Sequence, residues 1–490
     1  MNKACFVIGK VLAAIFAGIA VVFMLGVIAL NMLPFGIEVA VGAVSAALLA
    51  TVLWITWSGK GKVKMIVGTA LAVVMIIVLL LGTVYVYKTL DALDTISNAE
   101  TETIHVGVYI LADRADADDE NAADYCYGIL GEMDRSSTDK ALEKMTQRFG
   151  KQPVCREYDR LPELVEALYS GQIDAMVLNC AYLDILQELK GYEDIMSRVS
   201  ELVLYEMEVQ IGEGSQTEPT TPEDNKTEAG LLSPFVLYIS GIDAFGSVSV
   251  RSRSDVNILA VVNPMTRQVA LISTPRDYYV PLSISGGELD KLTHAGIYGV
   301  NVSIDTLEML YDIDIDYYFR VNFSGFTKLI DALGGITVYS QYAFKTKHYT
   351  FEKGLNTMDG AKALAFCRER YSFSSGDRQR GRNQMAVIQA VIDKALSPAL
   401  LTNYTQVIEA ATGAFETSMP MEIIGAITAE QLKEGGAWNI VTYSADGIGD
   451  SQIPYSLNFA TYVMQPDYDT VEKAKILIQK VYNGEILNTQ

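Results

Sequence analysis

The segment FVLYISGIDAFGSVSVRSRSDVNILAVVNPMTRQVALISTPRD, residues 235–277, contains three apolar runs separated by polar connections. Short apolar runs bounded by Gly, Asn and Pro are typical of β-strands. The runs 235–242, 256–264 and 268–275 are apolar at nearly every position, as expected for strands that are covered on both faces. We therefore expect a central sheet with helices packed on both sides.

The sequence downstream supplies further elements of the same α/β domain. Residues 335–340 predict another strand, and residues 302–312, 324–334 and 382–396 predict helices. This mixture of strands and helices favours a central mixed sheet flanked by helices. We place this domain at residues 233–490.

A second, smaller α/β domain is expected upstream, at residues 100–212. Part of it, 167–179, loosely resembles a segment of solute-binding proteins, but a spacer or partner-docking role is the favoured interpretation. An acidic linker rich in Glu, Thr and Pro, residues 213–232, separates the two domains. The predicted elements of the small domain are strands at 105–112 and 203–211, helices at 124–135 and 138–150, and a helix–strand–helix unit at 161–189.

The composition has two opposing features. The 490 residues include 38 Lys+Arg and 59 Asp+Glu, which gives a net charge of −21, yet the mean hydropathy is +0.20. The apolar residues are concentrated in the first 90 or so positions, and the remainder is ordinary acidic globular sequence. This balance excludes a generally basic nucleic-acid binder and a disordered chain. Five Cys residues exclude a disulfide-built scaffold.

Residues 1–90 predict a membrane anchor of three helices. Apolar stretches run over about 11–33, 39–57 and 65–87, and none contains an internal Asp, Glu, Lys or Arg. Each is close to the roughly 20 residues that a helix needs to cross a bilayer. A cleaved signal peptide has one such stretch, so three in tandem indicate a permanent anchor.

The basic residues around these stretches predict the orientation. The N-terminus carries Lys3 and Lys10, and the connection between the second and third stretches carries Lys60, Lys62 and Lys64. Because positive loops stay in the cytoplasm, we expect a cytoplasmic N-terminus. Three crossings then place both folded domains outside the cell.

Acidic residues occur where the predicted strands of the large domain begin and end. Asp243 follows the first strand, Asp255 begins the second, and Arg276 and Asp277 follow the third. Two carboxylates at one sheet edge, together with phosphate oxygens, form a typical site for a hard cation. By spacing alone, solvated aspartates and a surface ion pair remain the default interpretation.

Five arginines, and no lysine, lie between residues 368 and 382. Arg368 and Arg370 are two apart and would face the same side of a predicted strand. Arg380 and Gln384 are four apart on one face of a helix. Arg binds phosphate oxygens through a planar fork, and the start of a helix favours an anion. Two interpretations remain at this point. The arginines form either a phosphate-binding site outside the cytoplasm or a basic helix N-terminus that is exposed to solvent.

The order of these motifs resembles the LytR-CpsA-Psr family of cell-envelope phosphotransferases. The matching elements begin with GID at 241–243, RSD at 253–255, STPRDYYV at 273–280 and KLTHAGIYG at 291–299. They continue with VNFSGFTKLIDALGGITV at 321–338, KGLNTMDGAKALAFCRER at 353–370 and GDRQRGRNQ, which ends at Gln384. The three-helix anchor and the accessory domain resemble the capsule-associated streptococcal branch.

The resemblance implies a phosphotransferase that moves a polyprenyl-pyrophosphate-linked glycopolymer, of capsule or teichoic-acid type, onto peptidoglycan. It implies that Asp243 and Asp255 bind Mg²⁺, with Mn²⁺ as the alternative ion, and that Asp277 has a supporting or base role. The expected catalytic residues are Asp243, Asp255, Arg276 and Asp277, and any of the three aspartates could be the base. It also implies an apolar tunnel for the isoprenoid tail. The arginines and the glutamine expected to contact the pyrophosphate are Arg253, Arg276, Arg368, Arg370, Arg380 and Gln384.

Two alternatives remain at the level of the sequence. One is a non-catalytic protein that binds lipid pyrophosphates and regulates envelope polysaccharide assembly, with capsule or wall assembly proteins as partners. The other is a transcriptional regulator, which the acidic charge and the expected location outside the cell disfavour. We expect an integral protein of the cell membrane that does not bind nucleic acid.

Overall fold

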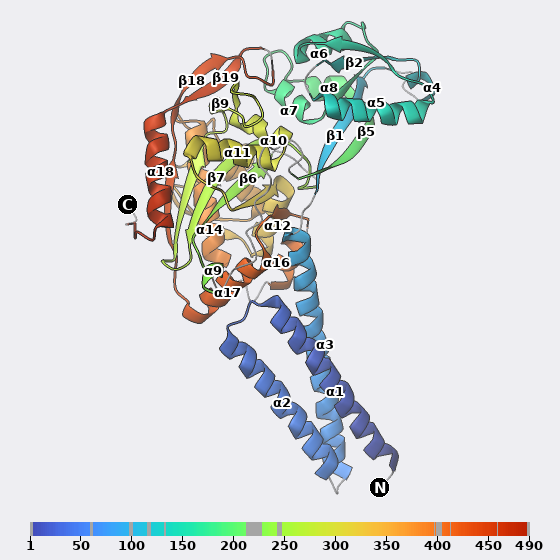
Figure 1. Cartoon of the computed structure of the whole chain (residues 1–490), viewed down its shortest axis with the longest axis vertical. Helices are drawn as coiled ribbons and strands as arrows, with labels where there is room; N and C mark the ends of the chain where they lie inside the picture. Colours follow the sequence, from blue (N-terminus) through green and yellow to red (C-terminus); the bar gives the residue numbers. More distant parts are fainter. Residues whose placement is uncertain are drawn as a thin grey trace.

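A computed structural model of the chain consists of a three-helix anchor and two α/β units stacked beyond it (Figure 1). In the anchor, α1 (Lys3–Leu30), α2 (Phe35–Ser58) and α3 (Lys62–Ser97) pack against one another. The structure describes residues 3–58, 62–97, 101–114, 119–131, 134–211, 228–242, 247–395, 397, 404–411, 413–457 and 459–487.

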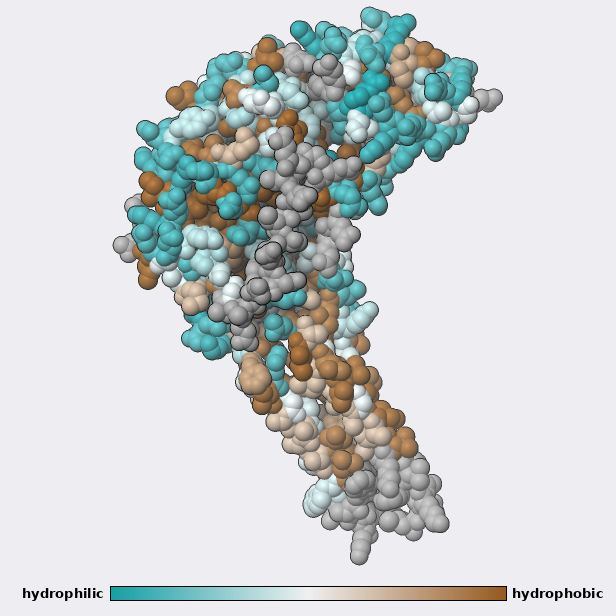
Figure 2. Space-filling model, viewed as in Figure 1, coloured by the Kyte–Doolittle hydropathy of each residue, from teal (hydrophilic) through white to brown (hydrophobic). Residues whose placement is uncertain are grey.

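All three anchor helices are long and apolar enough to cross a membrane. The candidate spans are Val11–Leu30, Phe35–Ile55 and Ile66–Ser97, and most of their residues are not buried inside the protein. Figure 2 shows this apolar surface on the helices, whereas the two α/β units are largely hydrophilic. The three predicted spans are therefore confirmed, and α3 extends beyond its predicted end.

The accessory unit is a five-stranded sheet with the order β3-β2-β4-β1-β5. Two hydrophobic clusters pack against its two faces, which explains why its central strands are buried. The prediction of a helix over 124–135 is wrong, because residues 126–130 form β2 between β3 and β4. The strands are β1 (Thr101–Leu111), β2 (Cys126–Leu130), β3 (Val154–Tyr158), β4 (Ala175–Asn179) and β5 (Val199–Gln210), and the helices are α4 (Asp119–Ala122), α5 (Arg135–Phe149), α6 (Leu161–Tyr169), α7 (Ala181–Gln187) and α8 (Ile195–Arg198).

The C-terminal unit contains a six-stranded mixed sheet with the order β16-β11-β6-β7-β8-β17. The three apolar runs of the opening segment form β6 (Phe235–Ile242), β7 (Ser254–Asn263) and β8 (Gln268–Thr274). These three strands are antiparallel neighbours, whereas β11 and β17 pair in parallel with β6 and β8. The outer strands are β11 (Tyr317–Asn322), β16 (Phe415–Thr417) and β17 (Asn439–Ser444).

Helices cover both faces of this sheet, as predicted. Ile258 and Ala260 of β7 pack towards α14 (Asp377–Ala395), whereas Leu259 and Val261 pack towards α11 (Val300–Tyr311) and α18 (Tyr468–Tyr482). Successive residues of a strand point to opposite faces, so a strand buried on both sides must be apolar at consecutive positions. The fold class is thus α/β, as the sequence predicts.

Two predicted elements differ from the structure. The strand expected at 335–340 exists as β12 (Ile336–Ser340), but it pairs with β15 (Gly354–Met358) in a separate two-stranded sheet. The strand expected to carry Arg368 and Arg370 is wrong, because α13 occupies Gly360–Arg368. Asp359 caps this helix by accepting a hydrogen bond from the Lys362 backbone N–H (2.8 Å).

The remaining elements surround the two faces of the sheet. The predicted linker, 213–232, lies outside the described residues up to position 227. The elements not yet given are α9 (Glu228–Leu231), β9 (Tyr279–Pro281), β10 (Leu289–Lys291), a 3₁₀ turn (Leu292–His294), α10 (Ala295–Tyr298), α12 (Phe323–Ala332), β13 (Phe344–Lys345), β14 (Thr350–Phe351), α16 (Tyr404–Ala411), α17 (Met421–Glu434), β18 (Gly447–Gln452) and β19 (Thr461–Pro466).

A buried ionic network joins the accessory unit to the central sheet. Glu102 of β1 accepts a hydrogen bond from Arg251 Nε (2.8 Å) and also pairs with Arg320 of β11. Arg320 in turn pairs with Glu416 of β16. Burial raises the pKa of Glu416 to about 7, in spite of the neighbouring guanidinium.

Candidate active site

The pairing of β7 with β8 brings Asp255 and Arg276 together. In this antiparallel pair, Asn257 lies opposite Thr274, so the start of β7 lies beside the residues that follow β8. Arg276 Nη1 lies 2.9 Å and 2.8 Å from the two carboxylate oxygens of Asp255. The Arg276 side chain is 4% exposed and that of Asp255 is 16% exposed. The structure thus brings together two of the predicted site residues.

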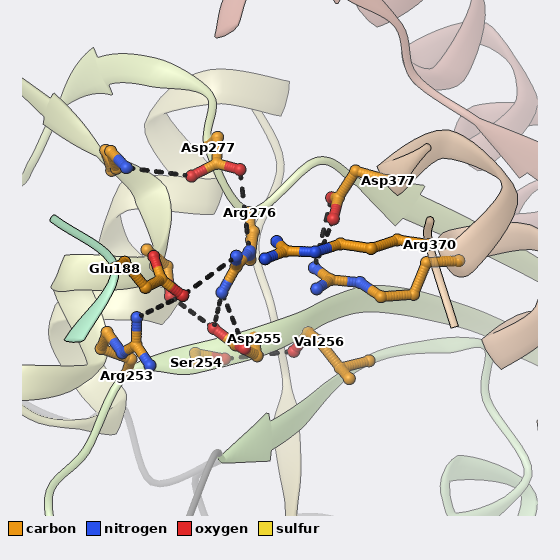
Figure 3. Close-up of polar contacts among 12 residues, drawn as sticks. Glu188, Arg253, Ser254, Asp255, Val256, Arg276, Asp277, Arg370 and Asp377 are labelled. Atoms are coloured by element: carbon orange, nitrogen blue, oxygen red, sulfur yellow. Dashed lines mark hydrogen bonds and ion pairs between the residues drawn. The ribbon is translucent and has the colours of Figure 1, made fainter. Parts of the chain in front are cut away.

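Arg253 lies beside this pair and contacts a residue of the accessory unit. Its Nη1 lies 3.0 Å from Oε1 of Glu188, and the same oxygen lies 3.3 Å from Nη2 of Arg276. Figure 3 shows the Glu188 carboxylate between the two guanidinium groups. Glu188 follows α7 and is therefore contributed by a different sheet from the one that carries Asp255.

Asp277 lies on the other side of Arg276. Its carboxylate is 3.6 Å from Arg276 Nε and 3.3 Å from Lys291 Nζ. Thr293, in the same segment as Lys291, donates a hydrogen bond to Asp255 (3.1 Å). The KLTHAGIYG motif thus supplies a cation and a hydroxyl to the site.

Helix α14 brings Arg380 and Gln384 to the same place. Arg380 pairs with Asp377 of its own first turn (2.9 Å), and both Arg380 and Gln384 line a cavity that also contains Arg276. Gly381 allows the close approach of this helix to the sheet, because a Cβ at that position would lie 2.8 Å from Ser273 Oγ. The predicted helical face of Arg380 and Gln384 is confirmed.

Arg368 and Arg370 reach the cavity from the end of α13. Arg368 lies over the ring of Phe323, with its guanidinium carbon 4.4 Å from the ring centroid. Arg370 donates a hydrogen bond to the Tyr371 hydroxyl (2.8 Å). All three residues Arg368, Arg370 and Tyr371 line the cavity, although the first two lie at a helix end rather than on a strand.

The site is electrostatically preorganised. Burial disfavours the charged form of Asp255, but Arg276, Arg253 and Arg380 outweigh burial and hold its pKa well below the usual range. The same balance, with burial opposed by Arg276 and Arg253, lowers the pKa of Glu188 to about 2. Burial and the adjacent Arg276 lower the pKa of Arg380. The two carboxylates are therefore ionised at neutral pH.

The second predicted metal ligand, Asp243, lies outside the described residues. Ile242, which precedes it, pairs with Ser254 at the end of β6. Within the described part of the chain, His, Cys, Asp and Glu form no group of three or more that could hold a metal ion. Asp255 nevertheless offers hard carboxylate oxygens, and Mg²⁺ often binds through one or two carboxylates with phosphates and water as its other ligands.

A cavity of about 520 Å³ extends from this charged cluster between the sheet and the helices. Beyond Arg380 and Gln384 it follows α14 to Ile392, which is roughly 18 Å along the helix axis at the usual rise per residue. Its walls there are apolar. They consist of Leu237, Ile239, Ala260, Val262, Val269, Phe319, Val321, Phe323, Phe326, Leu329, Leu364, Val387, Ile388, Val391 and Ile392.

The apolar end of the cavity faces the anchor. Leu237 and Val262 lie at the ends of β6 and β7 opposite Asp255, and both pack in a cluster with residues of α17. Helix α17 lies above the anchor (Figure 1), and Gly425 within it approaches the Asn31 carbonyl of the α1–α2 turn. The charged end therefore lies at the end of the sheet that is distant from the anchor.

Several residues of the site were not predicted from the sequence. Lys291 and Thr293 lie in a quoted motif, and the motif was the available signal. Asp377 was adjacent to the arginine cluster and could have been found as the acid of the first helical turn. Glu188 lies 88 positions before Arg276 in an ordinary amphipathic context, and nothing in the sequence distinguishes it.

Comparison with known proteins identifies relatives of the C-terminal unit. The chain is 35% identical over 206 residues to the polyisoprenyl-teichoic acid–peptidoglycan teichoic acid transferase TagU of Oceanobacillus iheyensis. The aligned region covers 41% of this chain and 63% of that protein. It is 33% identical over 211 residues to TagU of Enterococcus faecalis, covering 42% of this chain and 69% of the relative. The chain thus spans slightly less than two thirds of the first of these relatives.

A solved structure and a family model also match this chain. The crystal structure of Bacillus subtilis TagV aligns with 51% of this chain and 98% of its own length, at 28% sequence identity and a TM-score of 0.44. The model of the LytR_cpsA_psr family matches residues 204–475, which is more than half of the 490 residues. The motifs quoted above lie within this range, and the chain belongs to the LytR_cpsA_psr family.

Proposed function

We propose that the protein transfers a polyprenyl-pyrophosphate-linked glycopolymer onto a hydroxyl group of peptidoglycan. The observation that carries this proposal is the cavity, which joins a long apolar channel to a cluster of arginines. A lipid pyrophosphate has the same division into an apolar tail and a strongly anionic head. The relatives of this chain are named as transferases that join teichoic acid to peptidoglycan, which supports a wall glycopolymer as the donor; a capsular polysaccharide is the alternative.

The arginines would neutralise the pyrophosphate of the donor. The acceptor oxygen attacks the phosphorus that bears the glycan, the bond from that phosphorus to the bridging oxygen breaks, and polyprenyl monophosphate leaves with the bonding electrons. Arg276, Arg380 and Arg370 are available to bind the phosphate oxygens and to stabilise the charge that develops on the leaving group. Phosphoryl transfer depends mainly on such positioning and charge compensation.

The proton of the acceptor hydroxyl must pass to a base. Asp255 is a poor base in this state because its neighbouring arginines lower its pKa so far. We assign the role to Asp277, which lies beside both Arg276 and Lys291 at the charged end of the site. Lys291 and Arg276 hold this carboxylate in place at the charged end of the site.

A divalent cation fits the chemistry of this site. Asp255, with Asp243 as the second predicted ligand, would hold Mg²⁺, or Mn²⁺ in its place, together with oxygens of the donor. The cation would supply additional positive charge against the pyrophosphate. The chain's own contribution is to hold the carboxylate of Asp255 ionised and fixed by Arg276 and Thr293.

We infer that the N-terminus is cytoplasmic and that both α/β units are outside the cell. The lysines at positions 3, 10, 60, 62 and 64 support this orientation. In this arrangement, the apolar end of the cavity faces the outer surface of the membrane. The anionic head of the donor would then lie farther out, on the side from which peptidoglycan approaches.

The full-length protein in detergent micelles with Mg²⁺ should release phosphate from geranylgeranyl pyrophosphate. The substitutions Asp255→Ala and Arg276→Ala should each lower this rate at least about 100-fold, which is the usual effect of removing a group that stabilises charge in the transition state. Addition of EDTA should have the same effect, and added Mg²⁺ should reverse it.

Arg156→Ala is the matched control, because this exposed arginine of the accessory unit donates a hydrogen bond to the backbone carbonyl of Gln172, away from the site. Full activity in either site variant would overturn the site assignment. Tight binding of the lipid pyrophosphate without any turnover, also in the presence of a wall acceptor, would favour a non-catalytic regulator instead.

A further inference from the structure

Glu188 is mounted rigidly at the point where the accessory unit meets the active site. Helix α7, which ends immediately before it, is buried along most of its length. The Asn179 side chain accepts a hydrogen bond from the backbone N–H of Ala181, the first residue of this helix (3.1 Å). The Glu188 backbone N–H bonds to carbonyls of the last turn. The contacts of the Glu188 side chain with Arg253 and Arg276 add to this and tie the end of α7 to the C-terminal unit.

The carboxylate of Glu188 separates Arg253 from the cavity. Glu188 lines the cavity together with Arg276 and Arg380, whereas Arg253 does not line it. Arg253 is 4% exposed and contacts the same Glu188 oxygen that contacts Arg276. A ligand in the cavity therefore has direct access to Arg276 and Arg380, but it can reach Arg253 only where Glu188 has moved away.

These contacts distinguish a monophosphate from a pyrophosphate. A single phosphate at the end of a lipid tail can be bound by the arginines that already line the cavity. A pyrophosphate carries more negative charge than a monophosphate, and Arg253, which contacts Glu188, is a further cation that it could engage. Because Glu188 carries one negative charge and a phosphate group carries more, the second phosphate can compete for this position.

We propose that Glu188 is a specificity-determining residue that discriminates a lipid pyrophosphate from a lipid monophosphate through the second phosphate of the donor. In the free protein its carboxylate occupies the anion position on Arg253. The donor pyrophosphate displaces it, and Glu188 returns once the glycan-bearing phosphate has been transferred and only polyprenyl monophosphate remains. The accessory unit thereby responds to the loaded donor but not to the spent lipid. This inference rests on the proposed function.

Two other roles for Glu188 agree less well with the geometry. A general base needs a pKa near the working pH, and Arg276 and Arg253 hold that of Glu188 at about 2 against the effect of burial. A purely structural ion pair between the two units is already provided by the buried Glu102–Arg251 contact. Glu188, by contrast, is 35% exposed and faces the cavity.

The test compares two lipids with full-length protein in detergent micelles. Dissociation constants are measured for geranylgeranyl pyrophosphate and for geranylgeranyl monophosphate. Glu188→Gln should bind the pyrophosphate about tenfold more tightly than the wild type, because the Glu188 carboxylate no longer competes for Arg253. Its affinity for the monophosphate should change less than about threefold. Glu188→Asp, whose shorter side chain withdraws the carboxylate from Arg253, should also bind the pyrophosphate more tightly than the wild type and change the affinity for the monophosphate little.

Hydrogen exchange of residues 181–198 provides a second measurement. In the wild type, the pyrophosphate should speed up exchange in this segment and the monophosphate should not. In Glu188→Gln the exchange should already be fast without ligand. Glu143→Gln, an exposed glutamate on α5, should resemble the wild type in all measurements.

The possible outcomes separate this inference from the proposed function. Equal changes in the two dissociation constants, no change in either, or an exchange rate that does not respond to the pyrophosphate would overturn the role of Glu188 while lipid pyrophosphate binding itself stands. Failure of the wild type and of both variants to bind the pyrophosphate would overturn the proposed function, and the inference with it.

Discussion

Arg276 is the residue on which the charged cluster depends. It contacts three carboxylates, those of Asp255, Glu188 and Asp277, while its side chain is only 4% exposed. A lysine could not contact them all, because its ammonium group is a point charge whereas a guanidinium presents a planar fork. Removing a buried partner also leaves an uncompensated charge. The cluster is thus held in place before any substrate binds.

A second buried charged residue, Glu416, makes stability depend on pH. Because burial raises its pKa to about 7 from 4.5, the folded protein binds a proton more tightly than the unfolded chain. The contribution of this group to the free energy of unfolding is therefore fully present below about pH 4.5 and is lost as the pH rises to about 7. A shift of this size corresponds to roughly 3 kcal/mol.

Glu416→Gln should remove this dependence. The groups that face Glu416 are Arg320 and, beyond it, Glu102 with Arg251, and they are unchanged in the variant. We expect thermal unfolding of the full-length protein to show a smaller loss of midpoint temperature between pH 5 and pH 7.5 in Glu416→Gln than in the wild type. Glu352→Gln, at an exposed position, is the control. An identical pH dependence in all three proteins would contradict the raised pKa.

Individual residues were predictable where strand order brings them together. Asp255 and Arg276 follow from the antiparallel succession of β7 and β8, and Arg380 with Gln384 follows from helical spacing. Glu188 could not be predicted, because its position depends on how two separately folded sheets pack. One of the contacts that fix this packing, the Thr103–Ser249 backbone hydrogen bond (2.9 Å), carries no side-chain signature.

At the scale of elements, helix α14 has two functions. Its first turns carry Arg380 and Gln384 to the charged end of the cavity, and its later turns form an apolar wall with Ile388 and Ile392. The opposite wall is formed by strands β11, β6, β7 and β8. The distance between this helix and the sheet therefore sets the width available to a lipid tail.

Ile388→Trp should shorten the tail that the cavity accepts. The larger ring would fill the middle of the channel while leaving the charged end unchanged. We expect the KM for a long polyprenyl pyrophosphate to rise at least about tenfold, with little change for geranyl pyrophosphate, whose tail ends closer to the arginines. The measurement is the rate of phosphate release as a function of chain length.

Ile476→Trp is the matched control for this prediction. Ile476 is 52% exposed on α18, on the far face of the sheet from α14, so the same change in size should affect neither substrate. An equal rise in KM for long and short substrates in Ile388→Trp would show that the ring disturbs the arginines, and would contradict a tail-binding role for this wall.

Elements with a long periodic pattern were predicted correctly, whereas one short apolar run was not. The run 126–130 was interpreted as part of a helix, but it is the strand β2, which is buried between two neighbours. Periodicity cannot separate these alternatives in so few residues. For α13 the sequence did contain a decisive signal, because Asp359 followed by Gly-Ala-Lys-Ala is typical of a capped helix start. This signal outweighs the strand-like alternation of Arg368 and Arg370.

At the scale of the whole molecule, α3 runs from the anchor into the C-terminal unit without a break. Its candidate span of 32 residues is roughly 48 Å long, which exceeds the roughly 30 Å of a hydrocarbon core. Its last turns lie within the C-terminal unit, where Ala92, Leu93 and Ile96 are buried. The orientation of the cavity above the bilayer is therefore set by a rigid helix.

Inserting two alanines after Lys88 should uncouple the cavity from the membrane. Each added residue turns a helix by about 100°, so the catalytic unit would rotate by about 200° relative to α1 and α2. The contact between Asn31 and α17 would be lost, and the apolar end of the cavity would no longer lie above the anchor. We expect at least a tenfold loss of transfer from undecaprenyl substrates in vesicles. Release of phosphate from geranylgeranyl pyrophosphate in micelles should persist, because the active site itself is intact.

A seven-residue insertion at the same position is the matched control. It returns the rotation to within about 20° of the original while raising the unit by about 10 Å. Recovery of vesicle activity relative to the two-residue insertion would show that the rotation of the cavity matters. Substituting Lys88 by Ala should have little effect on activity, because both side chains of its ion pair with Glu409 are exposed to solvent. Wild-type activity of the two-residue insertion in vesicles would mean that the lipid reaches the cavity through solvent, and that the alignment of α3 with the sheet has no role in substrate entry.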